Sequence, residues 1–470
     1  MERHVVRTRA GIRLEALPEL VGVAPMDVAE RFRDLPGLAL FESARPGRNA
    51  RWTYLTADPV AVIETPSAGP DVFASARRLL RRLAADALDD ANAPAFTGGL
   101  AGFLGYDLGR QLERLPELTL ADQELPTLRL ALHDWVLAWD RRDGRAWLAG
   151  RAVDELVGRL DRRLAEVVER LDGPAPVVAT SDAPDGLEMR SGLDRAAYEA
   201  GVASIRRSIA EGDIYQANLT RRLEAPFRGD PWPLYRRLRT GDPALFAAYV
   251  DLGPSPFTGA PRAIASASPE PFLSVTRDGL VETNPIKGTR PRGRDRASDR
   301  ALACELLGSA KDRAENVMIV DVLRNDLGRV CRPGSVRVPR LCRLERTAAV
   351  QHLVSTVTGR LAPGRDAFDL LAASFPGGSI TGAPKIRAMQ LLEELEPVRR
   401  GPYTGAAGWL SPDGAMGTSI LIRSLVADGE RLTLHVGGGI AWRSDPAAEW
   451  YETVAKARGP LSAIGAREVV

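Results

Sequence analysis

The sequence predicts an α+β protein built mainly from antiparallel strands, with helices between groups of strands. Short segments of β-type residues follow one another with only a turn between them, at 128–140 and 146–150 and again at 263–267, 272–276 and 279–283. These strands look antiparallel, and predicted helices are interspersed among them. The content of 44% hydrophobic and 26% charged residues is that of an ordinary globular protein. We therefore expect α+β and not a doubly wound sheet.

Residues 1–172 are expected to form an N-terminal region that contributes to the sheet core. The predicted helices are 71–85 and 154–171, and the second has an amphipathic pattern. Residues 173–190 begin with Gly173-Pro174-Ala175-Pro176 and are predicted to be a linker. The predicted strands of this region are 39–41, 51–55, 60–65, 128–140 and 146–150.

Residues 191–465 are expected to form a second region, which carries the candidate site residues described below. Asp194 is a suitable N-cap for a helix that reaches Glu211, because Tyr198, Val202 and Ile205 recur at helical spacing behind it. Further helices are predicted at 301–326, 384–395 and 446–458, and further strands at 263–267, 272–276, 279–283, 349–361, 405–410, 419–427 and 431–437.

The bulk composition excludes several classes of partner. With 63 basic and 61 acidic residues the net charge is +2, which favours neither nucleic acid nor an anionic membrane as a partner. No apolar run is long enough for a transmembrane helix or a signal core. The three cysteines show no metal-ligand spacing. We expect a cytoplasmic protein that binds neither nucleic acid nor membrane.

Lys287 has the strongest chemical signal in the chain. It lies in Asn284-Pro285-Ile286-Lys287-Gly288-Thr289-Arg290-Pro291, between an apolar stretch and a glycine turn. A partly desolvated lysine loses its proton more readily and becomes a nucleophile or base near neutral pH. The alternative interpretation is a lysine that is on the surface by chance.

Two predicted helices carry carboxylates on one face. Glu315 shares a face with Asp312, and Glu449 and Glu452 are spaced i, i+3. Two such helices could hold Mg²⁺, which takes a few protein oxygens and leaves its other positions to water or substrate. The alternative is two solvated acidic faces.

Other polar residues lie in unusually apolar or glycine-rich surroundings. Arg423, within the apolar run 420–425, requires a partner that is either a carboxylate ligand or an internal salt bridge. Residues 436–440 are expected to form a loop in which Gly438 and Gly439 let a ligand approach the backbone. His352 follows Val350-Gln351 on a predicted strand and could equally be a core histidine.

Together these segments resemble the chorismate-utilising enzyme family, over about residues 191–457 and in the family's order. The resemblance implies an anthranilate-synthase-like fold, with mainly antiparallel sheets packed on one another and flanked by helices. Residues 98–107 also resemble the family's N-terminal segment. The motifs that carry the resemblance are Gly212-Asp213-Ile214-Tyr215-Gln216, Ser268-Pro269-Glu270, the Lys287 turn, the Glu315 helix, the loop from Phe375 to Lys385 that contains Ser379, and the Gly437 segment with the Glu452 helix.

Two positions distinguish the reactions within this family. Members that add water to chorismate carry a lysine where this chain has Gln216. Members that form anthranilate resemble this chain at Gln216 but carry alanine where this chain has Lys287. Members that aminate C4 carry lysine there, so the resemblance implies formation of 4-amino-4-deoxychorismate for para-aminobenzoate and folate. The alternatives are anthranilate formation with an unusual lysine and, more remotely, a catalytically inactive binding subunit.

The resemblance also implies a role for each site residue. Lys287 would attack C2 of chorismate while Glu270 protonates the departing C4 hydroxyl, near His352. Glu315 and Glu452 would bind Mg²⁺, supported by Asp312 and Glu449. The residues implied to contact the substrate are Arg423, Tyr403, Gly438, Gly439, Ser379, Thr289, Gln216 and Lys456.

The ammonia is expected to come from a second protein. The chain contains no cysteine in a Gly-x-Cys-x-Gly nucleophile elbow, so a separate glutamine amidotransferase subunit is implied. The tryptophan-feedback segment of anthranilate synthases, Asn-Pro-Ser-Pro-Tyr, is replaced here by Asp242-Pro243-Ala244-Leu245-Phe246, and Glu42-Ser43 resembles only part of the other half of that site. We therefore expect no inhibition by tryptophan.

Overall fold

The computed structural model describes residues 5–9, 11–45, 51–86, 88, 92–176, 186–347 and 350–469. Most of the predicted linker, residues 177–185, and the predicted strand start at 349 lie outside the described residues. Within the described part of the chain the strands form two sheets, here sheet A and sheet B, and every strand pair is antiparallel except the pair of β10 (Glu188–Ser191) with β24 (Arg467–Val469).

Sheet A draws strands from both ends of the chain. In hydrogen-bonded order it contains β1 (Val5–Arg9), β2 (Ile12–Ala16), β9 (Arg145–Arg151), β8 (Trp135–Asp140), β4 (Trp52–Thr56), β3 (Ala39–Glu42), β12 (Phe246–Pro254), β13 (Pro261–Ser268), β22 (Ser424–Asp428), β23 (Arg431–Ile440), β11 (Gln216–Pro226), β10 and β24, with β19 (Gly382–Ala383) paired to β11.

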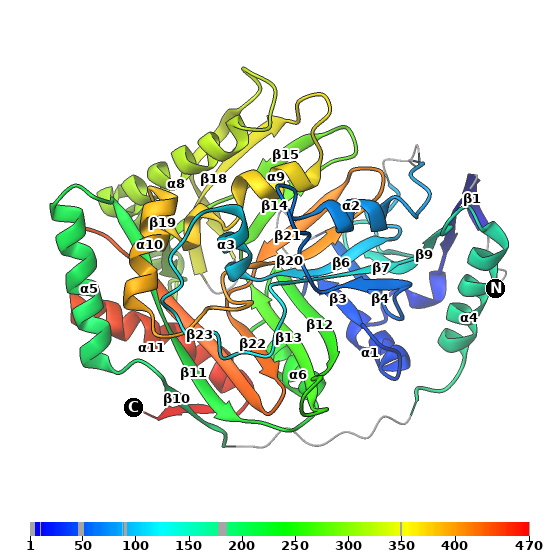
Figure 1. Cartoon of the computed structure of the whole chain (residues 1–470), viewed down its shortest axis with the longest axis horizontal. Coiled ribbons are helices and arrows are strands. Elements are labelled where there is room, and N and C mark those ends of the chain that lie inside the picture. Colours follow the sequence, from blue (N-terminus) through cyan, green and yellow to red (C-terminus); the bar gives the residue numbers. More distant parts are fainter. Residues whose placement is uncertain are drawn as a thin grey trace.

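Sheet B is likewise built from distant parts of the sequence. Its order is β16 (Ile286–Pro291), β18 (Val350–Arg360), β15 (Leu280–Thr283), β14 (Pro271–Val275), β21 (Met416–Ile420), β20 (Ala406–Leu410), β6 (Gly99–Leu104), β7 (Leu128–His133) and β5 (Ala61–Ile63), with β17 (Arg337–Arg346) paired to β18. In Figure 1 the blue and cyan N-terminal strands and the green to red C-terminal strands accordingly lie side by side in the same sheets.

The two sheets face one another across an apolar layer. Phe103 of β6 and Ala407 of β20 pack with Val250 of β12 and Ile264 of β13. Because these residues come from opposite sheets, the layer joins the N-terminal and C-terminal parts of the chain into one core. The predicted α+β fold of packed antiparallel sheets is confirmed.

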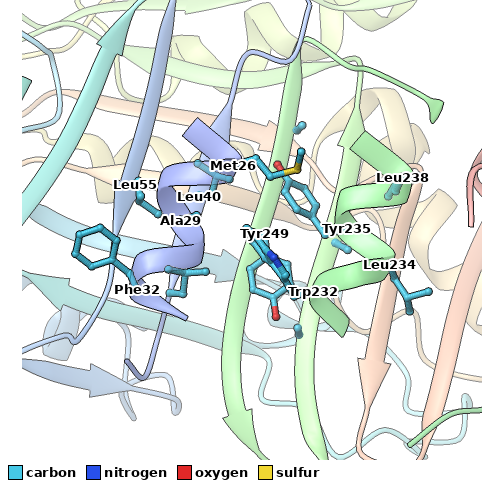
Figure 2. Close-up of a cluster of buried hydrophobic side chains, with 14 of the residues drawn as sticks. Met26, Ala29, Phe32, Leu40, Leu55, Trp232, Leu234, Tyr235, Leu238 and Tyr249 are labelled. Atoms are coloured by element: carbon cyan, nitrogen blue, oxygen red, sulfur yellow. The ribbon is translucent and has the colours of Figure 1, made fainter. Parts of the chain in front are cut away.

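Helices cover the outer faces of the sheets. α6 (Pro231–Gly241) packs on β13, and α11 (Pro446–Ala463) packs on β23. α10 (Lys385–Leu395) packs on β11, and α8 (Ala310–Gly328) packs on β16 and β18 (Figure 1). Figure 2 shows one such layer, in which Phe32, Trp232, Tyr235 and Tyr249 are buried beside α1 and α6. The helices are α1 (Pro25–Ala29), α2 (Ala74–Leu80), α3 (Gly109–Leu112), α4 (Val157–Asp172), α5 (Arg195–Ala210), α6 (Pro231–Gly241), α7 (Arg296–Gly308), α8 (Ala310–Gly328), α9 (Ala367–Ser374), α10 (Lys385–Leu395) and α11 (Pro446–Ala463), with 3₁₀ turns at η1 (Pro18–Leu20), η2 (Glu30–Phe32), η3 (Tyr106–Leu108) and η4 (Gly378–Ile380). None of the helices in the described ranges has the length and apolarity that a membrane span requires.

Several predicted elements were wrong in their boundaries. The predicted strand 128–140 is two strands, β7 and β8, which belong to different sheets. The predicted helix 301–326 is two helices, because Ser309 leaves the helical conformation and its hydroxyl caps α8 by accepting the N–H of Asp312 at 3.2 Å. The predicted strand 419–427 is divided between β21 and β22, which belong to different sheets. The predicted helix 71–85 is only α2. Among the elements that the sequence did not predict are β11, β12, β16 and α6.

Two of the points at which the chain passes between the two sheets adjoin each other. Glu270 lies between β13 of sheet A and β14 of sheet B, and Arg423 lies between β21 and β22. The Ile420 N–H donates to the Glu270 carbonyl at 3.1 Å, and the Ala267 N–H donates to the Arg423 carbonyl at 3.0 Å. These backbone hydrogen bonds fix the two crossings side by side.

Candidate active site

A cavity of about 650 Å³ opens at these crossings, bounded by α8, α11, β16 and β23. It collects residues that are far apart in the sequence. Every residue predicted to act in catalysis, substrate binding or metal binding lines it except Gln216; those that do are Lys287, Glu270, His352, Arg423, Tyr403, Gly438, Gly439, Ser379, Thr289, Lys456, Glu315, Glu452, Glu449 and Asp312.

Lys287 is placed in the cavity by a β-bulge. In the pairing of β16 with β18, Lys287 is opposite Leu353 and Thr289 is opposite His352, so Gly288 has no partner. Gly288 has φ of +76°, and a Cβ there would lie 2.8 Å from the Cβ of Asp312 on α8. Glycine is therefore required at this position both by the backbone conformation and by the close approach of α8.

Ser379 connects Lys287 with Glu270. Lys287 Nζ donates to the Ser379 carbonyl at 3.2 Å, and the Ser379 side chain hydrogen-bonds to the Glu270 carboxyl. Burial raises the pKa of Glu270 although Lys287 and Ser379 oppose that change. Burial lowers the pKa of Lys287 although Glu315 and Glu270 oppose it. Both shifts favour the uncharged form of each group.

His352 is buried and paired with Thr289. The Thr289 hydroxyl lies 2.9 Å from His352 Nδ1. The pKa of His352 is lowered to about 4, mainly by burial and to a smaller extent by the positive charges of the nearby Arg45 and Arg423. The imidazole is therefore neutral at pH 7 and can exchange hydrogen bonds without carrying charge.

The predicted metal ligands lie on the helical side of the cavity. Asp312 and Glu315 come from α8, and Glu449 and Glu452 come from α11. Burial raises the pKa values of Glu315 and Glu449. Burial would also raise the pKa of Glu452, but the neighbouring Lys456 outweighs it and holds that pKa below its usual value.

Cations within the protein partly balance these carboxylates. Lys456 Nζ lies 2.8 Å from Glu452 Oε1, and Lys311 Nζ lies 3.9 Å from Glu315 Oε1. That Glu315 oxygen is buried and accepts no hydrogen bond in the described structure. Among the described residues no three His, Cys, Asp or Glu side chains already converge on one ion position. A buried carboxylate oxygen without a hydrogen bond nevertheless suits a hard divalent cation, since Mg²⁺ prefers oxygen ligands.

The rest of the cavity lining includes a guanidinium, a phenol and bare backbone. Arg423 pairs with Asp242, with Nη1 3.6 Å from Oδ1, and its side chain remains 42% exposed. The Tyr403 ring stacks on His435 at a centroid distance of 5.1 Å, and burial raises the pKa of Tyr403, which keeps the phenol protonated. Arg423 is not inside a strand, as the sequence suggested, because it occupies the crossing between β21 and β22.

The glycine segment is not a loop, which corrects the expectation from the sequence. Gly437, Gly438 and Gly439 belong to β23 and pair with β11. A Cβ on Gly438 would lie 3.2 Å from Glu449 Oε2. The missing side chain therefore leaves room where the strand passes the α11 carboxylates, and the Gly437 carbonyl accepts a hydrogen bond from Lys456 Nζ at 2.8 Å.

Gln216 does not line the cavity. It is fully buried at the start of β11, and a Cβ on Gly439 would lie 2.6 Å from its Nε2. It hydrogen-bonds to Asn218 Oδ1 at 3.4 Å, and Asn218 in turn donates to the Ser379 carbonyl at 3.0 Å. Gln216 thus supports the cavity wall from behind.

Several lining residues were missed at the sequence level, among them Asn218, Thr220, Lys311, Thr404 and His435. Asn218 and Thr220 are buried residues two positions apart on β11, which was not predicted as a strand. Lys311 had a detectable signal, because it precedes Glu315 by one helical turn.

Known proteins resemble this chain over most of its length. The chorismate binding enzyme family model matches residues 39–462. The chain is 44% identical over 361 residues to aminodeoxychorismate synthase component 1 of Klebsiella aerogenes, covering 77% of this chain and 76% of that protein. It is 40% identical over 444 residues to anthranilate synthase component 1 of Streptomyces coelicolor, covering 92% and 84%.

Solved structures show the same fold. The crystal structure of anthranilate synthase component I from Streptococcus pneumoniae TIGR4 has a TM-score of 0.76 at 30% sequence identity, covering 88% of this chain and 93% of that chain. The menaquinone-specific isochorismate synthase MenF of Escherichia coli, at 19% identity, has a TM-score of 0.72 and covers 99% of this chain and 96% of that chain. With a family match over most of its length and these relatives, the chain belongs to the chorismate binding enzyme family.

Proposed function

We propose that this protein aminates chorismate at C4 with ammonia and releases 4-amino-4-deoxychorismate and water. The observation that supports this reaction most directly is the Lys287 amine, which lies in the cavity within reach of Ser379 and near Glu270. A neutral buried amine is a nucleophile. The residue at this position matters because the relatives are named for different reactions.

The chain's own residues account for the proton and bond changes. The neutral Lys287 amine attacks C2 of chorismate, the ring double bond shifts, and the C4 hydroxyl leaves as water after taking a proton from Glu270. Ammonia then adds at C4, the double bond returns, and the bond from Lys287 to C2 breaks. The protonated amines formed in these steps return one proton to Glu270, which restores the starting state. Buried Glu270, with its raised pKa, is suited to hold that proton near neutral pH.

Mg²⁺ is the proposed cofactor. Glu315 and Glu452, with Asp312 and Glu449 in support, would hold it, and it would act as a Lewis acid and template at the substrate's ring carboxylate. The other carboxylate would lie against Arg423, Tyr403 and the backbone of Gly438 and Gly439, with Lys456 alongside. Thr289 and His352 would lie on the side of the departing oxygen, with Ser379.

Ammonia would reach this site from a separate glutamine amidotransferase subunit. The aminodeoxychorismate synthase relatives are named as component 1, which implies a second component in those proteins. Ammonium salts should replace that subunit in vitro.

The second candidate function is anthranilate formation. It is favoured by the 40% identity to the Streptomyces coelicolor protein, which extends over 92% of this chain. Lys287 argues against it, because the anthranilate-forming pattern described above has alanine there. A catalytically inactive binding subunit is the more remote alternative, and the intact set of carboxylates around the cavity argues against it.

Product analysis distinguishes these functions. With chorismate, Mg²⁺ and an ammonium salt, we expect chorismate to be consumed without the fluorescence of anthranilate. Adding an aminodeoxychorismate lyase should then release 4-aminobenzoate, identified by chromatography. Direct appearance of anthranilate would replace our assignment by the second candidate, and no turnover by the purified protein with its amidotransferase would support the inactive subunit.

Tryptophan should not inhibit the reaction. Residues 245 and 246 and Glu42-Ser43 line a second cavity of about 780 Å³ between the sheets. Glu42 is already bound by Arg239, with Nε and Nη2 at 2.9 and 2.5 Å from its carboxylate oxygens. A ligand ammonium group would therefore have to displace a buried ion pair. Initial rates with and without 1 mM tryptophan should agree within error; a concentration-dependent fall in rate would contradict this prediction.

A further inference from the structure

Asp242 is a charged residue beside the cavity that has no role in the reaction described so far. It caps the C-terminal end of α6 and lies 3.6 Å from the Arg423 guanidinium. A Cβ on Gly459 of α11 would be 3.4 Å from its Oδ2. Asp242 is therefore held between α11 and Arg423, at the edge of the proposed carboxylate site.

Arg45, from the N-terminal part of the chain, belongs to the same group of charges. The Ala44 N–H donates to the Ala244 carbonyl at 3.0 Å, which fixes the end of β3 against the segment that follows Asp242. The pKa of Arg45 is lowered, mainly by burial; the positive charge of Arg423 lowers it further, and the carboxylate of Asp242 opposes the change. Arg45 and Arg423 also act together on the cavity residue His352. Arg45, Asp242 and Arg423 are thus electrostatic neighbours next to the cavity.

This group contains two guanidinium groups and one carboxylate, so it carries an excess positive charge. Arg45 Nε is buried and has no hydrogen-bond partner among the described residues. A buried donor without a partner and an uncompensated positive charge both favour an anion nearby. A carboxylate ligand would match the planar guanidinium groups.

We propose that Arg45, Asp242 and Arg423 form a charge-tuned carboxylate subsite for the substrate, in which Asp242 holds the Arg423 guanidinium before binding and Arg45 supplies the positive charge that favours the incoming carboxylate. This inference rests on the proposed function, because it takes chorismate as the anionic ligand. Arg45 and Asp242 are positioning residues in this account: they act through Arg423 and the local field.

The proposal predicts opposite effects from two substitutions that each remove one charge. Arg45→Gln should weaken chorismate binding about three- to tenfold, and Asp242→Asn should strengthen it by a similar factor, since each changes one unit charge near the bound anion in a partly screened medium. Calorimetric titration of each full-length variant with chorismate, with Mg²⁺ and without ammonia, measures the dissociation constants. KM should follow these changes while kcat stays within about twofold.

The opposite signs separate this role from a structural one. If Asp242 served only to hold the local structure, Asp242→Asn would weaken binding and lower the melting temperature. The exposed pair Arg228 and Glu430 provides matched controls, because Arg228 follows β11 and Glu430 precedes β23, at the end of these strands away from the cavity. Arg228→Gln and Glu430→Gln should leave the dissociation constant unchanged.

Two results would overturn the proposal. One is an unchanged dissociation constant in Arg45→Gln, and the other is weaker binding in Asp242→Asn. If the unmodified protein itself fails to bind chorismate, the proposed function is wrong and this inference falls with it. Binding by the unmodified protein with no response in the two variants refutes the subsite alone.

Discussion

Replacing Lys287 by alanine should lower kcat for C4 amination by about a hundredfold or more, equivalent to at least about 2.7 kcal/mol of transition-state stabilisation. The Lys287 side chain lines the cavity and belongs to none of the apolar cores of the protein, so the variant should fold. Some activity should remain, because ammonia can attack the ring without the lysine adduct. Rates of chorismate consumption with ammonium salt, at saturating substrate, measure the effect.

Lys287→Arg is the matched control. It keeps a positive charge at position 287, but a guanidinium stays protonated and is not a nucleophile. If the lysine acts only through its charge, the arginine variant should retain most of the activity; if it acts as a nucleophile, arginine should be as poor as alanine. Mass spectrometry of protein quenched with chorismate but without ammonia should show an adduct on Lys287. An unchanged rate and product in Lys287→Ala would disprove the nucleophile role.

The pH dependence follows from the burial of Lys287 and Glu270 together. The active form has a neutral amine and a protonated carboxyl, so the pair then holds one proton. Burial lowers the pKa of Lys287 and raises the pKa of Glu270, and both shifts favour this form over the ion pair with the same total charge. The rate should rise with pH as the pair loses its first proton and fall as it loses its second, with both apparent pKa values belonging to the pair. In Lys287→Ala the rise on the acid side should disappear.

The sequence predicted which residues meet in the cavity better than it predicted the path of the chain. Lys287, Glu315 and Glu452 could be singled out because each is a charged residue in an apolar or helical context that limits its partners. The helices with clear caps and periodicity, such as the one that begins after Asp194, were also predicted correctly; the Asp194 side chain accepts the Ala197 N–H as expected. These signals are local, so they are visible without tertiary structure.

The features that were missed depend on pairing between distant segments. Arg423 looked like part of one long strand, because the apolar run continues through the point at which the chain leaves sheet B for sheet A. Arg423 has φ of +51° where the chain changes direction. An arginine gives no sequence signal for this backbone conformation. The glycines 437–439 looked like a loop for the opposite reason: glycine is rare inside strands, and here the strand needs glycine because α11 and Gln216 approach it closely.

Replacing Glu315 or Glu452 by glutamine should abolish most of the activity and weaken Mg²⁺ binding by at least about tenfold, since even residues that only support metal ligands cost 10- to 100-fold when mutated. Glutamine preserves the size of the side chain and removes its charge. Calorimetric titration with Mg²⁺ alone measures the affinity independently of turnover. Asp321→Asn, on the same helix α8 but with its side chain 65% exposed, is the control and should bind Mg²⁺ normally.

Stability should change in the opposite direction to function in Glu315→Gln. Burial raises the pKa of Glu315, so the ionised carboxylate destabilises the folded protein relative to the protonated form. This destabilisation is fully present above the folded-state pKa and disappears as the pH falls below the unfolded-state pKa. Removing the charge should therefore raise the melting temperature by about 1–2 °C in the absence of metal. At the same concentration, added Mg²⁺ should stabilise the unmodified protein more than the variant, because the stabilisation by a ligand that binds only the folded state grows with the ratio of its concentration to its dissociation constant. A variant that is less stable without Mg²⁺ and is stabilised by Mg²⁺ as much as the unmodified protein would show that Glu315 serves the structure of α8 and does not hold the metal.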